Sequence, residues 1–232
     1  MIYDKPKLFR KVTASLLGLL SVMTSTYAEA SEGVKLDRTR VVFQNGRSEE
    51  ILGVINDLQQ AMLVRASFED QNGKPTDKIM ALPSVYRLES GKSNRIRLVS
   101  VGDFPQDKES VFFVTVTFYP IVKAEENSVR YGMGHKIKVF YRPKSVTEDC
   151  RYVADQLKWR LEGSSLKVSN PTNLSISLTE LDFGDAKKQV DMLLPGQEAN
   201  YELNRSSNRI TKFTFQYIDE FGARKIKEVS LE

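Results

Sequence analysis

The sequence has little of what most metal, redox and hydrolytic sites are built from. Its 232 residues include one cysteine, Cys150, and one histidine, His135. A lone cysteine excludes an internal disulfide bond, and a lone histidine excludes a histidine-rich metal site. A Ser–His–Asp triad would have to use His135, which stands beside lysines on an expected strand and is more typical of a surface residue. We interpret Cys150 as a buried or incidental thiol, because no basic partner is obvious beside it.

Motifs for nucleotide binding and hydrolysis are also missing. The sequence contains no G-x-S-x-G, no Walker loop and no glycine-rich fingerprint between a strand and a helix. The acidic pairs Glu49–Glu50 and Glu125–Glu126 fall in expected exposed turns, where solvation explains them. We therefore predict that the protein is not an enzyme and has no catalytic residue, cofactor or metal. An acid–base pair assembled from distant carboxylates stays open as the alternative.

Neither sign of charge dominates the chain. The formal net charge is +4, and the first 30 residues hold four basic and two acidic side chains, so the remainder carries +2. This balance gives no argument for a nucleic-acid partner or an anionic membrane surface. Any function that depends on positive charge must therefore reside in a local patch.

Long apolar runs are confined to the N-terminus. A basic lead, Lys5 to Lys11, precedes the run VTASLLGLLSVM, which is too short to span a bilayer as a helix. The segment TSTYAEA then offers small residues for cleavage after Ala28 or Ala30. This order predicts a secretory signal peptide over residues 1–30 and a mature protein in the periplasm, with an uncleaved membrane anchor as the alternative.

The rest of the sequence is a series of short apolar or alternating runs separated by turn signals. NRIRLVSV and SVFFVTVTFYP are examples, and no stretch keeps a long apolar period of 3.6 residues. Short strands at a spacing of roughly 8–12 residues predict an all-β sandwich rather than an α/β fold. The pattern stops after Pro143 and resumes at Trp159, so we predict two β-sandwich domains, residues 31–145 and 149–232.

Basic side chains occupy one face of two expected strands. Arg38 and Arg40 share a face of the strand VKLDRTRVVF, and Lys136 and Lys138 share a face of HKIKVFY. A solvated sandwich face is the simple interpretation. The functional alternative is a pair of cations that converge from two strands on an anion, for which a planar guanidinium and an ammonium suit a carboxylate.

Several segments, taken in their order, resemble one known family. These segments are GVKLDRTRVVF, PSVYRLESGKSNRIRLV, DKESVFFVTV and KIKVFYRP in the first half, and SNPTNLSISL, MLLPGQE and YIDEFGAR in the second. Together they resemble the periplasmic pilus-assembly chaperones of the chaperone–usher pathway, the PapD-like family. The resemblance implies two immunoglobulin-like domains arranged as a boomerang, with a subunit-binding cleft between them.

The resemblance also implies roles for particular residues. The second arginine of LDRTR falls on Arg40 and the second lysine of KIK on Lys138, which in such chaperones bind the C-terminal carboxylate of a pilus subunit. The strand carrying VRYGMG matches the donated strand, so Val129, Tyr131 and Met133 are expected to enter the open groove of a subunit that lacks its last strand. Ordinary burial of these three side chains in the protein's own sandwich is the alternative.

A third set of matching residues is expected to be structural. Arg97, Glu109 and Arg142 match a family ion network near the domain junction, and Glu220 matches its acidic partner in the second domain, where many relatives carry aspartate. Two other departures are Tyr119-Pro120-Ile121, where many relatives have IPP, and the missing cysteine pair late in the second domain. The first of these departures bears on the shape of the loop and on contact with an usher.

The resulting prediction is a periplasmic chaperone that binds, folds and caps pilus subunits and delivers them to an outer-membrane usher. Neither nucleic acid nor a small-molecule substrate is expected as a partner, and a self-capping oligomer stays open. The alternative from another class is an exported immunoglobulin-like adhesin or structural pilus subunit. A third hypothesis is an exported hydrolase whose active-site residues are scattered along the sequence.

Overall fold

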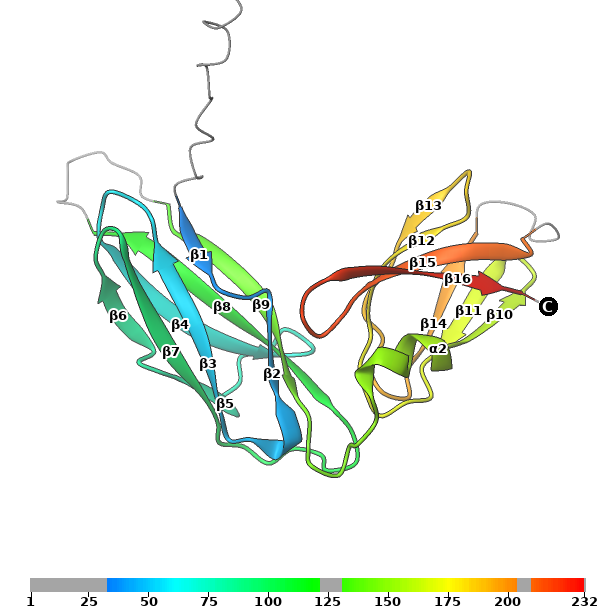
Figure 1. Ribbon diagram of the computed structural model, residues 1–232, viewed down its shortest axis with the longest axis horizontal. Coiled ribbons are helices and arrows are strands. Elements are labelled where there is room, and N and C mark those ends of the chain that lie inside the picture. Colours follow the sequence, from blue (N-terminus) through cyan, green and yellow to red (C-terminus); the bar gives the residue numbers. More distant parts are fainter. Residues whose placement is uncertain (1–32, 122–130, 204–209, 232) are drawn as a thin grey trace, which may run out of the picture. The chain divides into compact units, whose positions relative to one another are not determined.

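The computed structural model describes residues 33–121, 131–203 and 210–231. The expected signal peptide and Val129 lie outside the described residues. Within these ranges the chain forms sixteen strands, two short 3-10 turns and the one-turn helix α2 (Val153–Gln156) (Figure 1). The all-β prediction is therefore confirmed. In the same ranges, no helix has the length and apolar character needed to cross a bilayer.

The strands before Pro143 form two sheets. The first has the order β1 (Val34–Leu36), β3 (Glu49–Asn56), β7 (Lys92–Ser100), β5 (Ile79–Leu82). The second has the order β2 (Arg40–Phe43), β9 (Met133–Tyr141), β8 (Ser110–Pro120), β4 (Met62–Asp70), β6 (Val85–Leu88). All neighbours pair antiparallel except β2 and β9, which are parallel.

The strands from Lys158 onward form two further sheets. One has the order β10 (Lys158–Glu162), β11 (Ser165–Ser169), β14 (Glu198–Glu202). The other has the order β13 (Lys187–Gln189), β12 (Ser177–Asp182), β15 (Lys212–Ile218), β16 (Arg224–Ser230). Short 3-10 turns cover Gln44–Gly46 and Cys150–Tyr152, the second of which leads into α2.

Each pair of sheets encloses its own apolar core. In β8, Val114, Val116 and Phe118 are fully buried, while the residues between them face outward, as expected for a strand with one face on a core. The second core is centred on Leu181 and Phe215, which are also fully buried. Covering one such side chain contributes roughly 1.5–3 kcal/mol. Two separate cores explain why short alternating runs suffice to fold the chain without a disulfide.

The first strand segment differs from its predicted form, because it changes sheets. The segment VKLDRTRVVF does not form one strand: β1 pairs with β3, whereas β2 pairs with β9 in the other sheet. Asp37 lies at the crossing, where its backbone N–H donates to Gly53 O at 3.0 Å. Gly53 permits this close approach, since a Cβ there would lie 2.7 Å from Asp37 Oδ2. Consequently Arg38 and Arg40 are not neighbours on one strand face, and Arg38 instead pairs with Asp37.

One edge of β9 is only partly paired. Its neighbour β8 pairs along Met133–Tyr141, but β2 covers only Lys138–Tyr141 on the other side. The backbone of residues 133–137 therefore presents a strand edge to which another strand can add. His135 supplies a side-chain contact there, as its Nε2 lies 2.9 Å from Val34 O.

Buried asparagines fix a loop in each half of the chain. Asn56 donates to the carbonyls of Gln60, Leu88 and Glu89, and Asn170 donates to those of Leu174 and Leu194. Both asparagine side chains are fully buried, and each also accepts a backbone N–H two residues further on. These amides satisfy loop groups that would otherwise be buried without partners.

We expect Asn170→Ala to lower the free energy of unfolding by about 2–4 kcal/mol, because it leaves several buried polar groups without partners. Urea unfolding followed by fluorescence measures the change. Asn200→Ala, at an exposed position of β14, is the control and should change stability by less than about 0.5 kcal/mol. Equal stability of the two variants would contradict the structural role of Asn170.

Candidate functional site

The parallel pairing of β2 with β9 brings two cations together. Arg40 lies directly opposite Lys138 in the register, so residues almost a hundred positions apart in the chain become neighbours. Both side chains are half-buried. Neither forms an ion pair with a carboxylate among the residues that the structure describes. The site thus holds two adjacent positive charges without a direct counterion.

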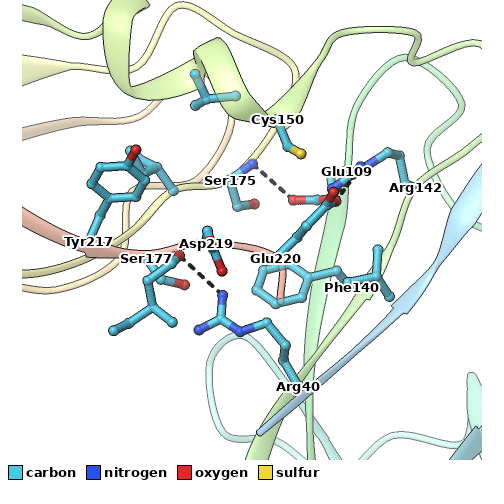
Figure 2. A pocket seen from close by; sticks show the side chains of 14 residues that line it. Arg40, Glu109, Phe140, Arg142, Cys150, Ser175, Ser177, Tyr217, Asp219 and Glu220 are labelled. Carbon is cyan, nitrogen blue, oxygen red and sulfur yellow. Dashed lines mark hydrogen bonds and ion pairs between the residues drawn. The ribbon is translucent and has the colours of Figure 1, made fainter. Parts of the chain in front are cut away.

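The Arg40 guanidinium is held by contacts from both halves of the chain. Its Nη1 donates to Ile218 O at 3.2 Å, and its Cζ lies 5.8 Å from the centre of the Phe140 ring. Within the described residues, Nε is buried and has no hydrogen-bond partner. Burial lowers the pKa of Arg40, and the negative charge of Asp219 opposes this shift. Figure 2 shows Arg40 and Asp219 around the same small cavity.

Lys138 is positioned by a residue from the second half of the chain. Its Nζ donates to Ser177 Oγ at 3.3 Å, and Ser177 is itself buried. Burial lowers the pKa of Lys138, the positive charge of Arg40 lowers it further, and Asp191 opposes both effects. A bound anion would relieve the repulsion between the two cations and replace the water they have lost.

The cavity behind Arg40 is small. It measures about 40 Å³ and is lined by both halves of the chain, with Ser175, Tyr217 and Cys150 among its walls (Figure 2). This space holds a few water molecules and is far below the roughly 300 Å³ of a typical cofactor pocket. Across the described residues, no cluster of three or more metal-ligating side chains occurs. Two adjacent half-buried cations are chemically suited to holding an anion such as a carboxylate.

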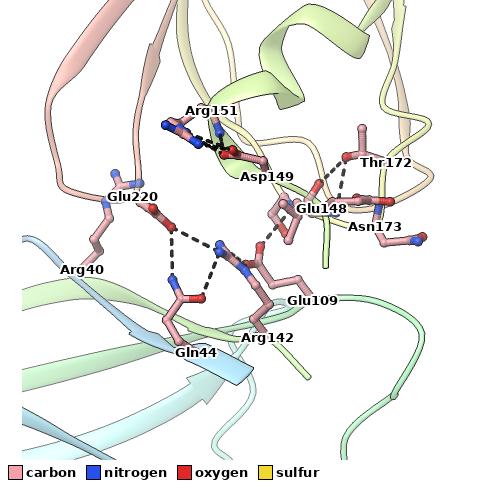
Figure 3. A network of polar contacts seen from close by, with 12 residues as sticks. Arg40, Gln44, Glu109, Arg142, Glu148, Asp149, Arg151, Thr172, Asn173 and Glu220 are labelled. Carbon is pink, nitrogen blue, oxygen red and sulfur yellow. Dashed lines mark hydrogen bonds and ion pairs between the residues drawn. The ribbon is translucent and has the colours of Figure 1, made fainter. Parts of the chain in front are cut away.

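An ion network centred on the buried Arg142 and Glu109 lies near Arg40 (Figure 3). Arg142 donates to Glu109 Oε1 through Nη2 at 2.9 Å and Nε at 3.1 Å, and through Nη1 to Glu220 Oε2 and Gln44 Oε1 at 3.2 Å. The other Glu109 oxygen accepts the backbone N–H of Ser175 at 2.9 Å. Burial raises the pKa of Glu109, although Arg142 opposes the shift. The network joins residues at the start of β8, at the end of β9 and in the first 3-10 turn to the β15–β16 turn and to the segment before β12.

One residue expected in this network is not part of it. Arg97 lies on β7 between the buried residues Ile96 and Leu98, so its side chain faces away from the core. Its Nε is 3.7 Å from Glu49 Oε2, and both side chains are about half exposed. The assignment of Arg97 to the network is therefore corrected. Gln44, which sequence reasoning missed, takes part instead: its Nε2 donates to Glu220 Oε2 at 3.2 Å.

The apolar residues expected on the donated strand are exposed where the structure describes them. Tyr131 is 81% exposed and Met133 is 47% exposed, whereas Val129 lies outside the described residues. Met133 is in β9 at its partly paired edge. Gly132 faces the other way, where a Cβ would lie 2.8 Å from the Tyr119 ring. Burial of Tyr131 and Met133 in the protein's own core, the alternative interpretation, is not observed.

The remaining polar residues of interest have ordinary surroundings. Lys136 pairs with Glu69 and lies over the Phe113 ring at 4.9 Å, so it is not merely solvated. Cys150 is half-buried, and burial together with the nearby carboxylate of Glu220 raises its thiol pKa to about 12. A thiol with so high a pKa is poorly reactive.

Comparison with known proteins decides the family. Residues 33–147 match the family model described as pili and flagellar-assembly chaperone, PapD N-terminal domain, and residues 152–229 match that of pili assembly chaperone PapD, C-terminal domain. The chain belongs to the PapD-like pilus-assembly chaperones.

Relatives and solved structures agree with this assignment. The chaperone PapD of Escherichia coli is 31% identical over 211 residues, covering 85% of this chain and 86% of PapD. FimC of E. coli K12 is 28% identical over 216 residues, covering 90% and 88%. The structure of the E. coli chaperone DraB superposes with a TM-score of 0.76 at 30% identity, covering 86% of this chain and 99% of DraB.

Family membership settles the functional class. The protein is a pilus-assembly chaperone, and its fold is that of two immunoglobulin-like domains. The predicted family, fold class and chaperone function are confirmed, and the adhesin, pilus-subunit and hydrolase alternatives are not. The family is one of periplasmic chaperones, and chaperones are not an enzyme class.

The ion network gives a prediction about this chaperone's stability. We expect Arg142→Met to lower the free energy of unfolding by about 3–5 kcal/mol, because it leaves the buried Glu109 carboxylate unpaired. Combining it with Glu109→Gln should recover part of this loss, since no charge then remains buried alone. Urea unfolding measures both variants.

Arg97→Met is the control and should cost less than about 1 kcal/mol, because its ion pair with Glu49 is exposed. A double variant no more stable than Arg142→Met alone would contradict the role of the unpaired charge.

Proposed function

We propose that this chaperone binds the C-terminal carboxylate of a pilus subunit on Arg40 and Lys138 while it lends the free edge of β9 to that subunit. The observation that carries the proposal is the juxtaposition of the two features. The cation pair lies at one end of the β2–β9 pairing, and the partly paired edge of β9 begins at the next residue toward its N-terminus.

The proposal divides recognition between charge and apolar contact. Two half-buried cations without a direct counterion would hold one chain end and so set the register of the added strand. The exposed side chains of Tyr131 and Met133 would enter the open groove of the subunit, together with Val129. Each apolar side chain so covered could contribute roughly 1.5–3 kcal/mol. Backbone pairing along residues 133–137 would also cover an aggregation-prone edge.

The ion network has a supporting part in the proposal. Glu109, Arg142, Gln44 and Glu220 connect the two halves of the chain beside Arg40. A buried network of this kind fixes orientation more than it adds stability. We infer that it keeps Ile218 O and Ser177 in place, where they position the two cations.

The proposal extends to export and delivery. Residues 1–30 would act as a signal peptide cleaved after Ala28 or Ala30, and the mature chain would consist of domains at 31–145 and 149–232. Two separate apolar cores and the matched ranges of the two family models support this division. Loaded subunits would pass to an outer-membrane usher, as expected for the chaperone–usher pathway.

Substitution of either cation tests the carboxylate site. The probe is a synthetic peptide of about ten residues, one strand in length, with alternating apolar residues and a free C-terminal carboxylate; its C-terminal amide is the comparison. We expect the wild-type chaperone to prefer the free acid. Arg40→Ala and Lys138→Ala should each lose about 2–5 kcal/mol of binding to the acid and abolish the preference.

Lys136→Ala is the matched control, since Lys136 lies two residues away on the same face of β9 but pairs with Glu69. The Lys136→Ala variant should keep the wild-type preference for the free acid over the amide, because its ammonium group is paired with Glu69 and does not belong to the carboxylate site. Thermal unfolding confirms that each variant is folded. Tight binding of the free acid by folded Arg40→Ala and Lys138→Ala variants would overturn the proposal.

The pH dependence of binding tests Lys138 separately. Because burial and Arg40 lower its pKa below the usual 10.5, Lys138 loses its charge at a lower pH than an exposed lysine does. Affinity for the free acid should therefore fall as the pH rises, and the fall should begin at a lower pH than for a lysine with the usual pKa of 10.5. Lys138→Arg should bind without this decline, because a guanidinium stays charged. Parallel pH profiles for the two proteins, measured by isothermal titration, would exclude Lys138 from the site.

A further inference from the structure

The turn between β15 and β16 carries an aromatic side chain that is not buried in the protein's own core. Phe221 is 84% exposed, the largest exposed fraction of any large apolar side chain among the described residues. Hydrogen bonds fix the backbone of this turn. Gly222 N–H donates to Asp219 O, and Asp219 Oδ1 accepts the N–H groups of Phe221 and Ala223. Polar residues and glycine are the usual choice at such a tip, which makes a phenylalanine there uncommon.

Three neighbours of Phe221 hold this turn against the first half of the chain. Ile218 O accepts Arg40 Nη1 at 3.2 Å, and Glu220 Oε2 accepts from both Gln44 and Arg142. At Gly222, an added Cβ would lie 2.5 Å from Thr39 Oγ1, so the turn lies close against the residue before Arg40. The backbone of the turn that carries Phe221 is therefore held close to Arg40.

We propose that Phe221 packs against the last side chain of the bound subunit and favours subunits that end in an aromatic or large apolar residue. This inference rests on the proposed function, because it is the carboxylate on Arg40 and Lys138 that brings the subunit's last residue to this place. Other apolar side chains lie near that site, since Phe140, Ile218 and Tyr217 line the cavity beside Arg40. A ligand whose terminal carboxylate lies on the cations presents its terminal side chain to the surfaces that border them.

Two contacts would contribute to specificity, one with the terminal carboxylate and one with the terminal side chain. Arg40 and Lys138 would recognise any free chain end, since every chain has a terminal carboxylate. Phe221 would add selectivity for the side chain, because ring-to-ring and ring-to-aliphatic contacts reward large apolar groups. Loss of Phe221 should therefore change which termini bind well while leaving the preference for a free carboxylate intact.

The test uses three synthetic peptides of the same strand-length sequence: one ends in phenylalanine, one in alanine, and one in phenylalanine amide. We expect the wild-type chaperone to bind the first about 3- to 10-fold more tightly than the second, the range of one aromatic contact. Phe221→Ala should bring the two free acids to equal affinity, and Phe221→Trp should retain the difference. Both variants should still prefer the free acid to the amide.

Ile226→Ala is the control, because Ile226 is a 65% exposed apolar residue of β16, the strand that follows the turn. It should bind all three peptides as the wild type does. A wild-type protein that prefers the acid to the amide but treats phenylalanine and alanine alike would overturn the role of Phe221 and leave the carboxylate site standing. A Phe221→Ala variant that still binds the phenylalanine acid more tightly than the alanine acid would also overturn the role of Phe221. Equal binding of acid and amide by the wild type would overturn both proposals.

Discussion

The site depends on one short parallel pairing, four residues of β2 with four residues of β9. It places Arg40 beside Lys138, and because it ends there, the rest of β9 keeps an unpaired edge. Both features follow from the crossing of the N-terminal segment between sheets at Asp37, which the absence of a side chain at Gly53 permits. Had β2 continued along β9, the edge would be covered, and had it stayed with β3, Arg40 would not meet Lys138.

The second half of the chain completes a site that the first half begins. Ile218 and Ser177 each contact one of the two cations, and Glu220 joins Arg142 and Gln44. The same turn that supplies Glu220 presents Phe221. The contacts that join the two halves and the proposed recognition of a ligand therefore involve the same few residues. A change in the Arg142 network should be felt at the cation pair even where the protein remains folded.

Much of this could be read from the sequence, and the failures have physical reasons. Alternation of apolar residues predicted the all-β fold, and the resemblance located Arg40 and Lys138. The sheet crossing was missed, although buried Val34 and buried Val41 and Phe43 have opposite parity, which signals a break between them. Arg97 was misassigned, although its place between buried Ile96 and Leu98 requires it to face outward. The contacts of Gln44 and the burial of Glu109 depend on the second half of the chain, which local patterns do not encode.

In the proposed complex, another chain adds to β9 and places its terminal carboxylate on the adjacent cations. Amide hydrogen exchange of the chaperone with the free-acid peptide measures this most directly. We expect amides within Met133–Ile137 to become strongly protected in the complex, while those of β16, at the edge of another sheet, do not change. Saturating peptide that leaves exchange in Met133–Ile137 unchanged would contradict it.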